Sequence, residues 1–103
     1  MTKLILIDPT AKTIEFVERK EMTIEALYDI VECQYLEGLT MAPELTLMYD
    51  EEAKLHGKAL DSFFVQDQLQ ILGKGILCRN NKEGDNIDAT DADLEFAKVA
   101  FSF

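Results

Sequence analysis

The 103-residue sequence is poor in the residue types that build metal sites. It has one histidine, His56, and two cysteines, Cys33 and Cys78, which stand alone in apolar surroundings. A zinc site needs several such ligands at short, regular spacings. We therefore expect no metal and no cofactor, and we interpret His56 as a loop residue and the cysteines as small buried hydrophobic residues. A disulfide would require an oxidising compartment, which nothing in the sequence indicates.

Long apolar runs and an excess of basic residues are also missing. No stretch approaches the roughly 20 apolar residues of a membrane-spanning helix, and residues 1–5 do not begin a signal peptide. We expect a soluble, cytoplasmic protein. Twenty acidic residues against 10 basic ones give a formal charge of −10 at pH 7. This charge disfavours contacts with nucleic-acid phosphates or an anionic membrane surface. It therefore either keeps the protein soluble or attracts a basic partner protein.

Common catalytic and phosphate-binding motifs are absent as well. The sequence has no Gly-x-Ser-x-Gly, and neither cysteine has an evident catalytic partner. Gly73-Lys74-Gly75 lacks the remainder of a phosphate-binding loop. We predict that the chain is not an enzyme. A pocket near Gly73–Gly75 for a small ligand such as a nucleotide is an alternative, for which only Lys74 and Arg79 offer nearby positive charge.

Clear secondary-structure patterns are present, and the first spans residues 3–17. Residues 4–7 form a continuous apolar run, which is typical of a strand buried on both faces. Ile14 and Phe16 alternate with other residues, as in a strand that has one exposed face. Asp8-Pro9 favours a chain reversal between them. The pattern predicts a β-hairpin, which is marginally stable alone and needs the rest of the chain to cover it.

A helix and a second hairpin are predicted next. Apolar residues at helical spacing predict a helix over residues 24–31, with Thr23 as its N-cap. The apolar face of this helix consists of Ile24, Leu27, Tyr28 and Val31. Alternating patterns in residues 33–41 and 45–49, around a turn at 42–44, predict the second hairpin.

The C-terminal half is less regular. Residues 69–78 resemble one strand in which Gly73 and Gly75 mark a bulge or a sharp bend. Thr90 and Asp93 have the spacing of a capping box, which favours a C-terminal helix. The last five residues either end this helix or form a strand. We predict a single α+β domain over residues 1–103, with a mostly antiparallel sheet of about five strands and one or two covering helices.

Two acidic groups are candidate binding sites. Asp50-Glu51-Glu52 follows the predicted strand 45–49, and six acidic residues lie between positions 83 and 95 with no basic residue among them. The spacing of the second group does not fit a calcium-binding EF-hand. Each group either consists of solvated side chains without a binding function or forms a surface that binds a basic groove of a partner protein. The candidate partner-binding residues are Asp50, Glu51, Glu52, Asp85, Asp88, Asp91 and Asp93.

Several strand ends and turns resemble a known family over nearly the whole chain. They are Leu6-Ile7-Asp8-Pro9, residues 13–17, Tyr49-Asp50-Glu51-Glu52, residues 72–77 and residues 83–88. The family is an uncharacterised group of small proteins from bacteriophages and other mobile elements, known as domain of unknown function number thirty-eight forty-six. The resemblance implies an accessory protein in the bacterial host cytoplasm and implies no activity. Our leading hypothesis is an acidic protein that binds and inhibits a host protein, such as one that handles nucleic acid or acts in defence, through its negatively charged surface.

Overall fold

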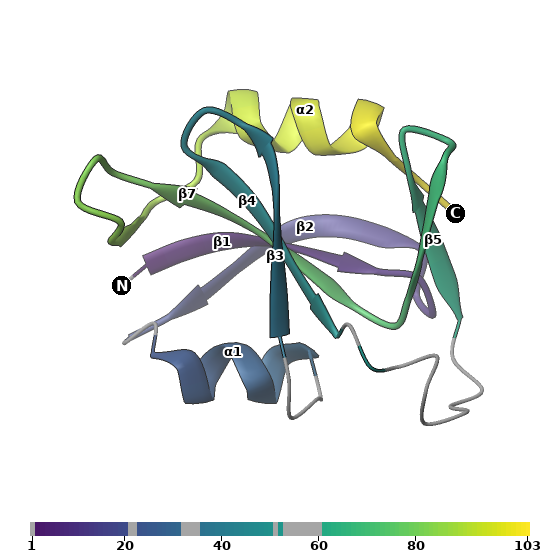
Figure 1. Cartoon of the computed structure of the whole chain (residues 1–103), viewed down its shortest axis with the longest axis horizontal. Coiled ribbons are helices and arrows are strands. Elements are labelled where there is room, and N and C mark those ends of the chain that lie inside the picture. Colours follow the sequence, from purple (N-terminus) through teal and green to yellow (C-terminus); the bar gives the residue numbers. More distant parts are fainter. Residues whose placement is uncertain (1, 21–22, 32–35, 51, 53–60) are drawn as a thin grey trace.

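The described part of the chain is built around one antiparallel sheet (Figure 1). The computed structural model describes residues 2–20, 23–31, 36–50, 52 and 61–103. Five strands follow the order β2-β1-β7-β4-β3, and β8 pairs with the end of β7. The strands are Thr2–Asp8 (β1), Thr13–Arg19 (β2), Leu36–Ala42 (β3), Leu45–Asp50 (β4), Gly75–Asn80 (β7) and Asn86–Ile87 (β8).

Both predicted hairpins are confirmed within this sheet. β1 and β2 pair along their whole length, and β3 pairs with β4 with a register shift near Thr40. Asp8 stabilises the first turn because its Oδ1 accepts hydrogen bonds from the backbone N–H groups of Thr10 (3.0 Å) and Ala11 (3.2 Å). The predictions for residues 33–35, Glu51 and His56 fall outside the described residues.

A second sheet, absent from the sequence prediction, has the strand order β6-β5-β9. Its strands are Ser62–Val65 (β5), Leu69–Leu72 (β6) and Phe101–Ser102 (β9). The prediction of one strand over residues 69–78 is wrong, because Gly73 turns the chain out of the second sheet before β7 begins. Gly73 has a φ of 83°, a conformation that is costly for residues with a side chain. The predicted bend at this glycine is therefore confirmed.

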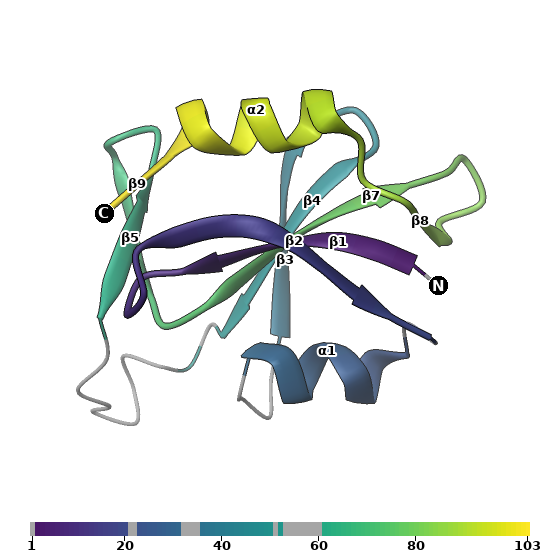
Figure 2. The ribbon, with the colours of Figure 1, turned by 180° about the vertical axis from the view of Figure 1, so that it is seen from behind.

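The two described helices lie on opposite faces of the central sheet (Figures 1 and 2). α1 spans Ile24–Val31 and α2 spans Asp91–Ala100. The predicted cap of α1 is confirmed, since the Oγ1 of Thr23 accepts a hydrogen bond from the N–H of Ala26 at 3.2 Å. The chain end contains both predicted alternatives, because β9 follows α2 directly. The α+β class is confirmed, and neither described helix has the length and apolar content to cross a membrane.

Two apolar cores explain why the central strands β1 and β7 are apolar on both faces. The core toward α1 contains Leu4, Leu27, Ile30, Val31, Ile76 and Cys78. The core toward α2 contains Ile5, Ile7, Leu47, Leu77 and Phe63, together with residues of the second sheet and of α2. Alternate residues of each central strand thus enter opposite cores. Phe63 is buried whereas its neighbour Phe64 is only partly buried, as expected for adjacent residues of a strand.

The turn between β5 and β6 contains backbone strain that a substitution should relieve. Gln66 and Asp67 have φ values of 51° and 60°, and the N–H of Gln68 donates to the carbonyl of Val65 at 3.0 Å, as in a type I′ turn. Asparagine tolerates a positive φ better than glutamine. We expect Gln66→Asn to raise the free energy of unfolding by about 0.5–1 kcal/mol in urea denaturation. Gln68→Asn, outside the positive-φ pair, is the control, and an equal gain in both variants would contradict this explanation.

Candidate functional site

The segment between β7 and α2, which includes β8, is held by hydrogen bonds to its own backbone and to β1. The Oδ1 of Asn81 accepts hydrogen bonds from the N–H groups of Glu83 (3.0 Å) and Asp85 (2.9 Å). Further along, the Oδ1 of Asp88 accepts a hydrogen bond from the N–H of Lys3 at 2.9 Å. The N–H of the next residue, Ala89, donates a hydrogen bond to the carbonyl of Lys3 at 2.8 Å. The acidic residues of this segment are therefore carried on a fixed backbone.

Most of the predicted partner-binding residues in this region are exposed. The exposed carboxylates between the turn after β7 and the second turn of α2 belong to five residues, which we term the acidic segment. They are Glu83, Asp85, Asp88, Asp91 and Glu95. No basic residue lies between positions 83 and 95. Arg79, on the neighbouring strand β7, is turned inward and paired. The acidic segment thus presents negative charge from the turn before β8 to the beginning of α2. Figure 2 shows the course of the backbone through these elements.

Asp93 does not belong to this exposed surface. Only 2% of the residue is exposed, and its carboxylate pairs with Arg79 through two hydrogen bonds, Nε to Oδ2 and Nη2 to Oδ1, both 2.7 Å. Oδ2 also accepts the N–H of Thr90 at 2.9 Å, and the Thr90 hydroxyl accepts the N–H of Asp93 at 3.1 Å. The predicted capping box is confirmed. The prediction that Asp93 contacts a partner is wrong, because its carboxylate fastens α2 to β7.

This ion pair makes stability depend on pH in the acid range. Hydrogen bonds from Arg79 hold the pKa of Asp93 below its ordinary value, against the opposing effect of burial. Such a carboxylate stabilises the fold above its unfolded pKa of about 3.9, and the contribution is lost as the pH falls through the lower folded pKa. We expect the stability advantage of the wild type over Asp93→Asn to be constant between about pH 6 and 8 and to shrink below about pH 4. Thermal unfolding of both proteins across this range is the measurement, and an advantage that persists undiminished to about pH 2 would contradict the assignment.

Asp50 and Glu52 are the described members of the other predicted acidic group, and they lie apart from the acidic segment and are less exposed. Asp50 is 8% exposed, and its Oδ1 accepts a hydrogen bond from the N–H of Glu52 at 3.0 Å. Leu45, at the start of β4, pairs with Arg79 near the end of antiparallel β7, so the end of β4 lies far along the sheet from the acidic segment. The structure does not bring the two groups together. Asp50 is thereby corrected from a partner-binding residue to a buried residue at a strand end, and Glu52 is half-buried.

Gly75, at the start of β7, allows close packing against its neighbours. A Cβ at Gly75 would lie 2.7 Å from the Cζ of Phe63 and 3.2 Å from the Cδ1 of Leu47. An aromatic ring therefore fills the space beside this glycine, and this close packing explains why residue 75 has no side chain. The alternative of a nucleotide pocket near Gly73–Gly75 stays a prediction.

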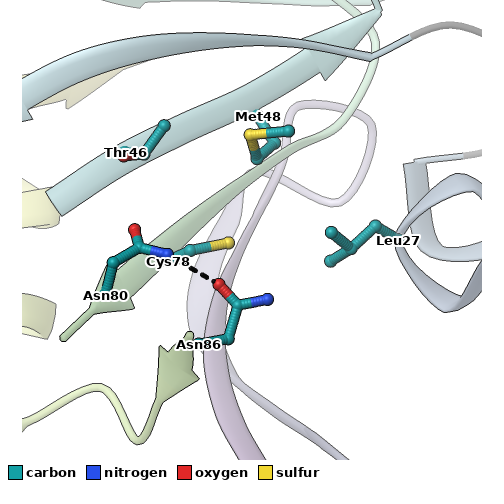
Figure 3. Close-up of a pocket in the computed structure, with 6 residues that line it drawn as sticks. All are labelled: Leu27, Thr46, Met48, Cys78, Asn80 and Asn86. Carbon is teal, nitrogen blue, oxygen red and sulfur yellow. Dashed lines mark hydrogen bonds between the residues drawn. The ribbon is translucent and has the colours of Figure 1, made fainter. Parts of the chain in front are cut away.

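A cavity lies on the α1 face of the sheet, toward the other end of β7 (Figure 3). Its volume is about 240 Å³, and it is lined by Leu27, Thr46, Met48, Cys78, Asn80 and Asn86. Burial raises the pKa of the Cys78 thiol to about 12, so this sulfur is not a nucleophilic thiolate at neutral pH. Among the residues that the structure describes, no group of three or more His, Cys, Asp or Glu side chains could hold a metal ion.

One comparison with known proteins identifies the family of the chain. The model of the family described as Domain of unknown function (DUF3846) matches residues 1–102. The chain belongs to this family. The resemblance inferred from strand ends and turns is thus confirmed for the DUF3846 family itself. No curated protein and no solved structure matches the chain.

Proposed function

We propose that this DUF3846 protein is a non-catalytic accessory protein that binds a basic partner protein through the acidic segment. The observation that carries the proposal is that five exposed carboxylates follow one another with no basic residue between them. Electrostatic complementarity of this kind accelerates association and discriminates against partners of the wrong charge. A formal charge of −10 on the whole chain adds a long-range attraction for a basic surface.

The rigidity of the acidic segment supports the proposal. Binding is weakened by the cost of ordering loops at an interface. Here Asn81 already orders the turn around Glu83 and Asp85, and Asp88 is tied to the backbone of Lys3. Arg79 of β7 is paired with Asp93, and the Nζ of Lys3 lies 4.7 Å from the centroid of the Phe16 ring. Glu95 forms an ion pair with Lys98 at 3.9 Å, but both side chains are exposed, so water screens this pair. The backbone therefore holds the negative charge in place, and most of it is available to a partner.

The kind of partner follows from charge and from the family context. A row of carboxylates is similar in charge to a row of phosphates, so a groove that normally holds nucleic acid is complementary to it. The resemblance to proteins of bacteriophages and other mobile elements extends the proposal to the cytoplasm of a bacterial host. In that setting the partner is a host protein that handles nucleic acid or acts in defence, and occupation of its groove inhibits it by excluding the natural substrate.

Charge reversal within the acidic segment should abolish partner binding. The double variant Asp85→Lys with Asp91→Lys changes the formal charge from −10 to −6, because each substitution adds two positive charges. Both side chains are exposed, so the fold should tolerate the changes. In a pull-down from bacterial lysate at low salt, we expect the double variant to capture at least about 10-fold less of the partner than the wild type captures.

A matched control is available on the opposite face of the sheet. Glu25→Lys with Asp29→Lys on α1 makes the same change in charge, and each pair includes one acidic residue from the first turn of a helix. We expect this control to capture the partner as the wild type does, because α1 lies across the sheet from α2 (Figure 1). If both variants lose the partner, binding depends on net charge and not on the acidic segment, and the proposal is contradicted. If both variants keep the partner, the proposal is contradicted as well.

A further inference from the structure

The cavity on the α1 face joins four elements of the fold around one small space (Figure 3). Strands β4 and β7 form its floor, Leu27 of α1 forms one wall, and Asn86 of β8 forms another. Its volume of about 240 Å³ corresponds to roughly eight water molecules at about 30 Å³ each. A molecule of about eight non-hydrogen atoms is therefore the size that fits.

The lining selects against charged molecules. Leu27, Met48 and Cys78 are apolar, and the other lining residues are an uncharged threonine and two asparagines. Burial raises the pKa of the Cys78 thiol to about 12, which keeps this wall neutral at physiological pH. The formal charge of −10 on the chain repels anions in addition. A phosphate-bearing molecule is thus disfavoured, and a neutral one is favoured.

Two carboxamides supply the polar contacts. The Nδ2 of Asn80 donates a hydrogen bond to the Oδ1 of Asn86 at 2.9 Å. The Oδ1 of Asn80 is buried and has no hydrogen-bond partner in the part of the chain that the structure describes. Figure 3 shows this oxygen directed away from Asn86, toward the strand that carries Thr46. Because a buried acceptor without a partner destabilises a protein, a donor that reaches this oxygen is favoured.

Rotation of the Asn80 carboxamide would make this oxygen available to a ligand. The oxygen is shielded from solvent in the free protein, but the last torsion of an asparagine side chain has a broad energy minimum. Rotation of the Asn80 carboxamide toward the cavity exchanges its hydrogen bond with Asn86 for contacts with the ligand. The thioether of Met48, which is only partly buried, can adjust to the shape of a flat molecule.

We propose that this cavity binds a neutral, planar heterocycle of the nucleobase type. A ring N–H donates to the Oδ1 of Asn80, a ring carbonyl accepts from the Nδ2 of Asn86, and the ring faces lie against Leu27 and Met48. Carboxamides recognise nucleobases through such paired donor and acceptor contacts. A pyrimidine base such as uracil has the required size and pattern of groups. Asn86 lies between Asp85 and Asp88 of the acidic segment in the sequence, but uracil binding is measured on the protein alone, so the inference does not depend on partner binding.

Titration of the wild-type protein with uracil, followed by NMR of the side-chain amide groups, tests the inference. We expect the resonances of Asn80 and Asn86 to shift saturably, with a Kd of about 1 mM or below. The exposed amides of Gln68 and Gln70 should not shift. Uridine 5′-monophosphate should bind at least about 10-fold more weakly than uracil, because its phosphate meets the negative field of the protein.

Two variants test whether the carboxamide of Asn86 contributes to uracil binding. Asn86→Leu keeps the approximate size of the side chain but removes the carboxamide, and we expect it to lower the uracil affinity at least about 10-fold. Gln68→Leu, at an exposed turn, should bind as the wild type does. If Asn86→Leu fails to fold, the wild-type resonances decide alone. The inference is overturned if no shift occurs up to about 20 mM uracil, if only other amides shift, or if the monophosphate binds more tightly.

Discussion

Replacing Asp93 with alanine is expected to lower the free energy of unfolding by about 2–4 kcal/mol. The change removes the partner of the two 2.7 Å hydrogen bonds that Arg79 makes, and it leaves the partly exposed guanidinium with Glu44 at 3.7 Å as an ion-pair partner. It also removes the side chain that accepts the N–H of Thr90, which ends the capping box of α2. Domains of this size have a stability of about 5–15 kcal/mol, so urea denaturation should show a large fall in the midpoint.

The control for this variant is Asp91→Ala. Asp91 lies in the same first turn of α2, but it is exposed and contributes mainly through the helix dipole. Its removal should cost about 0.3–1 kcal/mol. A loss for Asp93→Ala no larger than the loss for Asp91→Ala would show that the ion pair with Arg79 does not hold α2 on the sheet.

Replacing Phe63 with alanine is the second change with a large expected effect, a loss of about 3–5 kcal/mol. Phe63 is fully buried, and its ring meets that of Phe101 edge to face, with ring centroids 5.6 Å apart. The ring also covers Gly75 on the central sheet. Its removal leaves a cavity between the two sheets, which thermal or urea unfolding will report as lost stability.

The contact between Phe63 and Gly75 supplies a sharper test of the same packing. Gly75→Ala alone should cost about 1–3 kcal/mol, because its Cβ would lie 2.7 Å from the Cζ of the ring. In a Phe63→Leu background the cost should be clearly smaller, since leucine lacks the atom that clashes. Gly38→Ala is the control with the smaller expected cost, because its Cβ would lie 3.1 Å from the Cγ2 of Thr46 and 3.3 Å from the Sδ of the flexible Met48, both longer than the 2.7 Å contact at Gly75. Strictly additive losses for Gly75→Ala and Phe63→Leu would contradict this packing.

The elements that the sequence predicted are those that local patterns determine. The hairpin of β1 and β2 follows from an apolar run, a turn at Asp8-Pro9 and an alternating strand. The position of α1 follows from the spacing of its apolar residues and the cap at Thr23. The capping box of Thr90 and Asp93 also follows from spacing alone, and it already indicated that the carboxylate of Asp93 is used within the chain. Its inclusion among the partner-binding residues overlooked that signal.

Other features depend on contacts between residues far apart in the sequence. The second sheet joins β5 to β9 although Val65 and Phe101 are distant in the chain, and two-residue strands leave no periodic pattern. The pairing of Arg79 with Asp93 requires that α2 lie over β7, which no local pattern specifies. The cavity has the same origin, because Leu27, Met48 and Asn86 meet only after the sheet has formed. The exposure of the acidic segment was predictable from its composition, whereas the burial of Asp50 was not.

Binding of the wild-type protein to its captured partner as a function of salt concentration is the most direct measurement of the proposed role. If the acidic segment binds a basic groove, the affinity should fall steeply as salt rises, and the Asp85→Lys with Asp91→Lys variant should lose both the affinity and most of the salt dependence. The α1 control variant should keep most of both. A partner that stays bound at about 1 M salt, where charges are screened within about 3 Å, would contradict binding through the acidic segment.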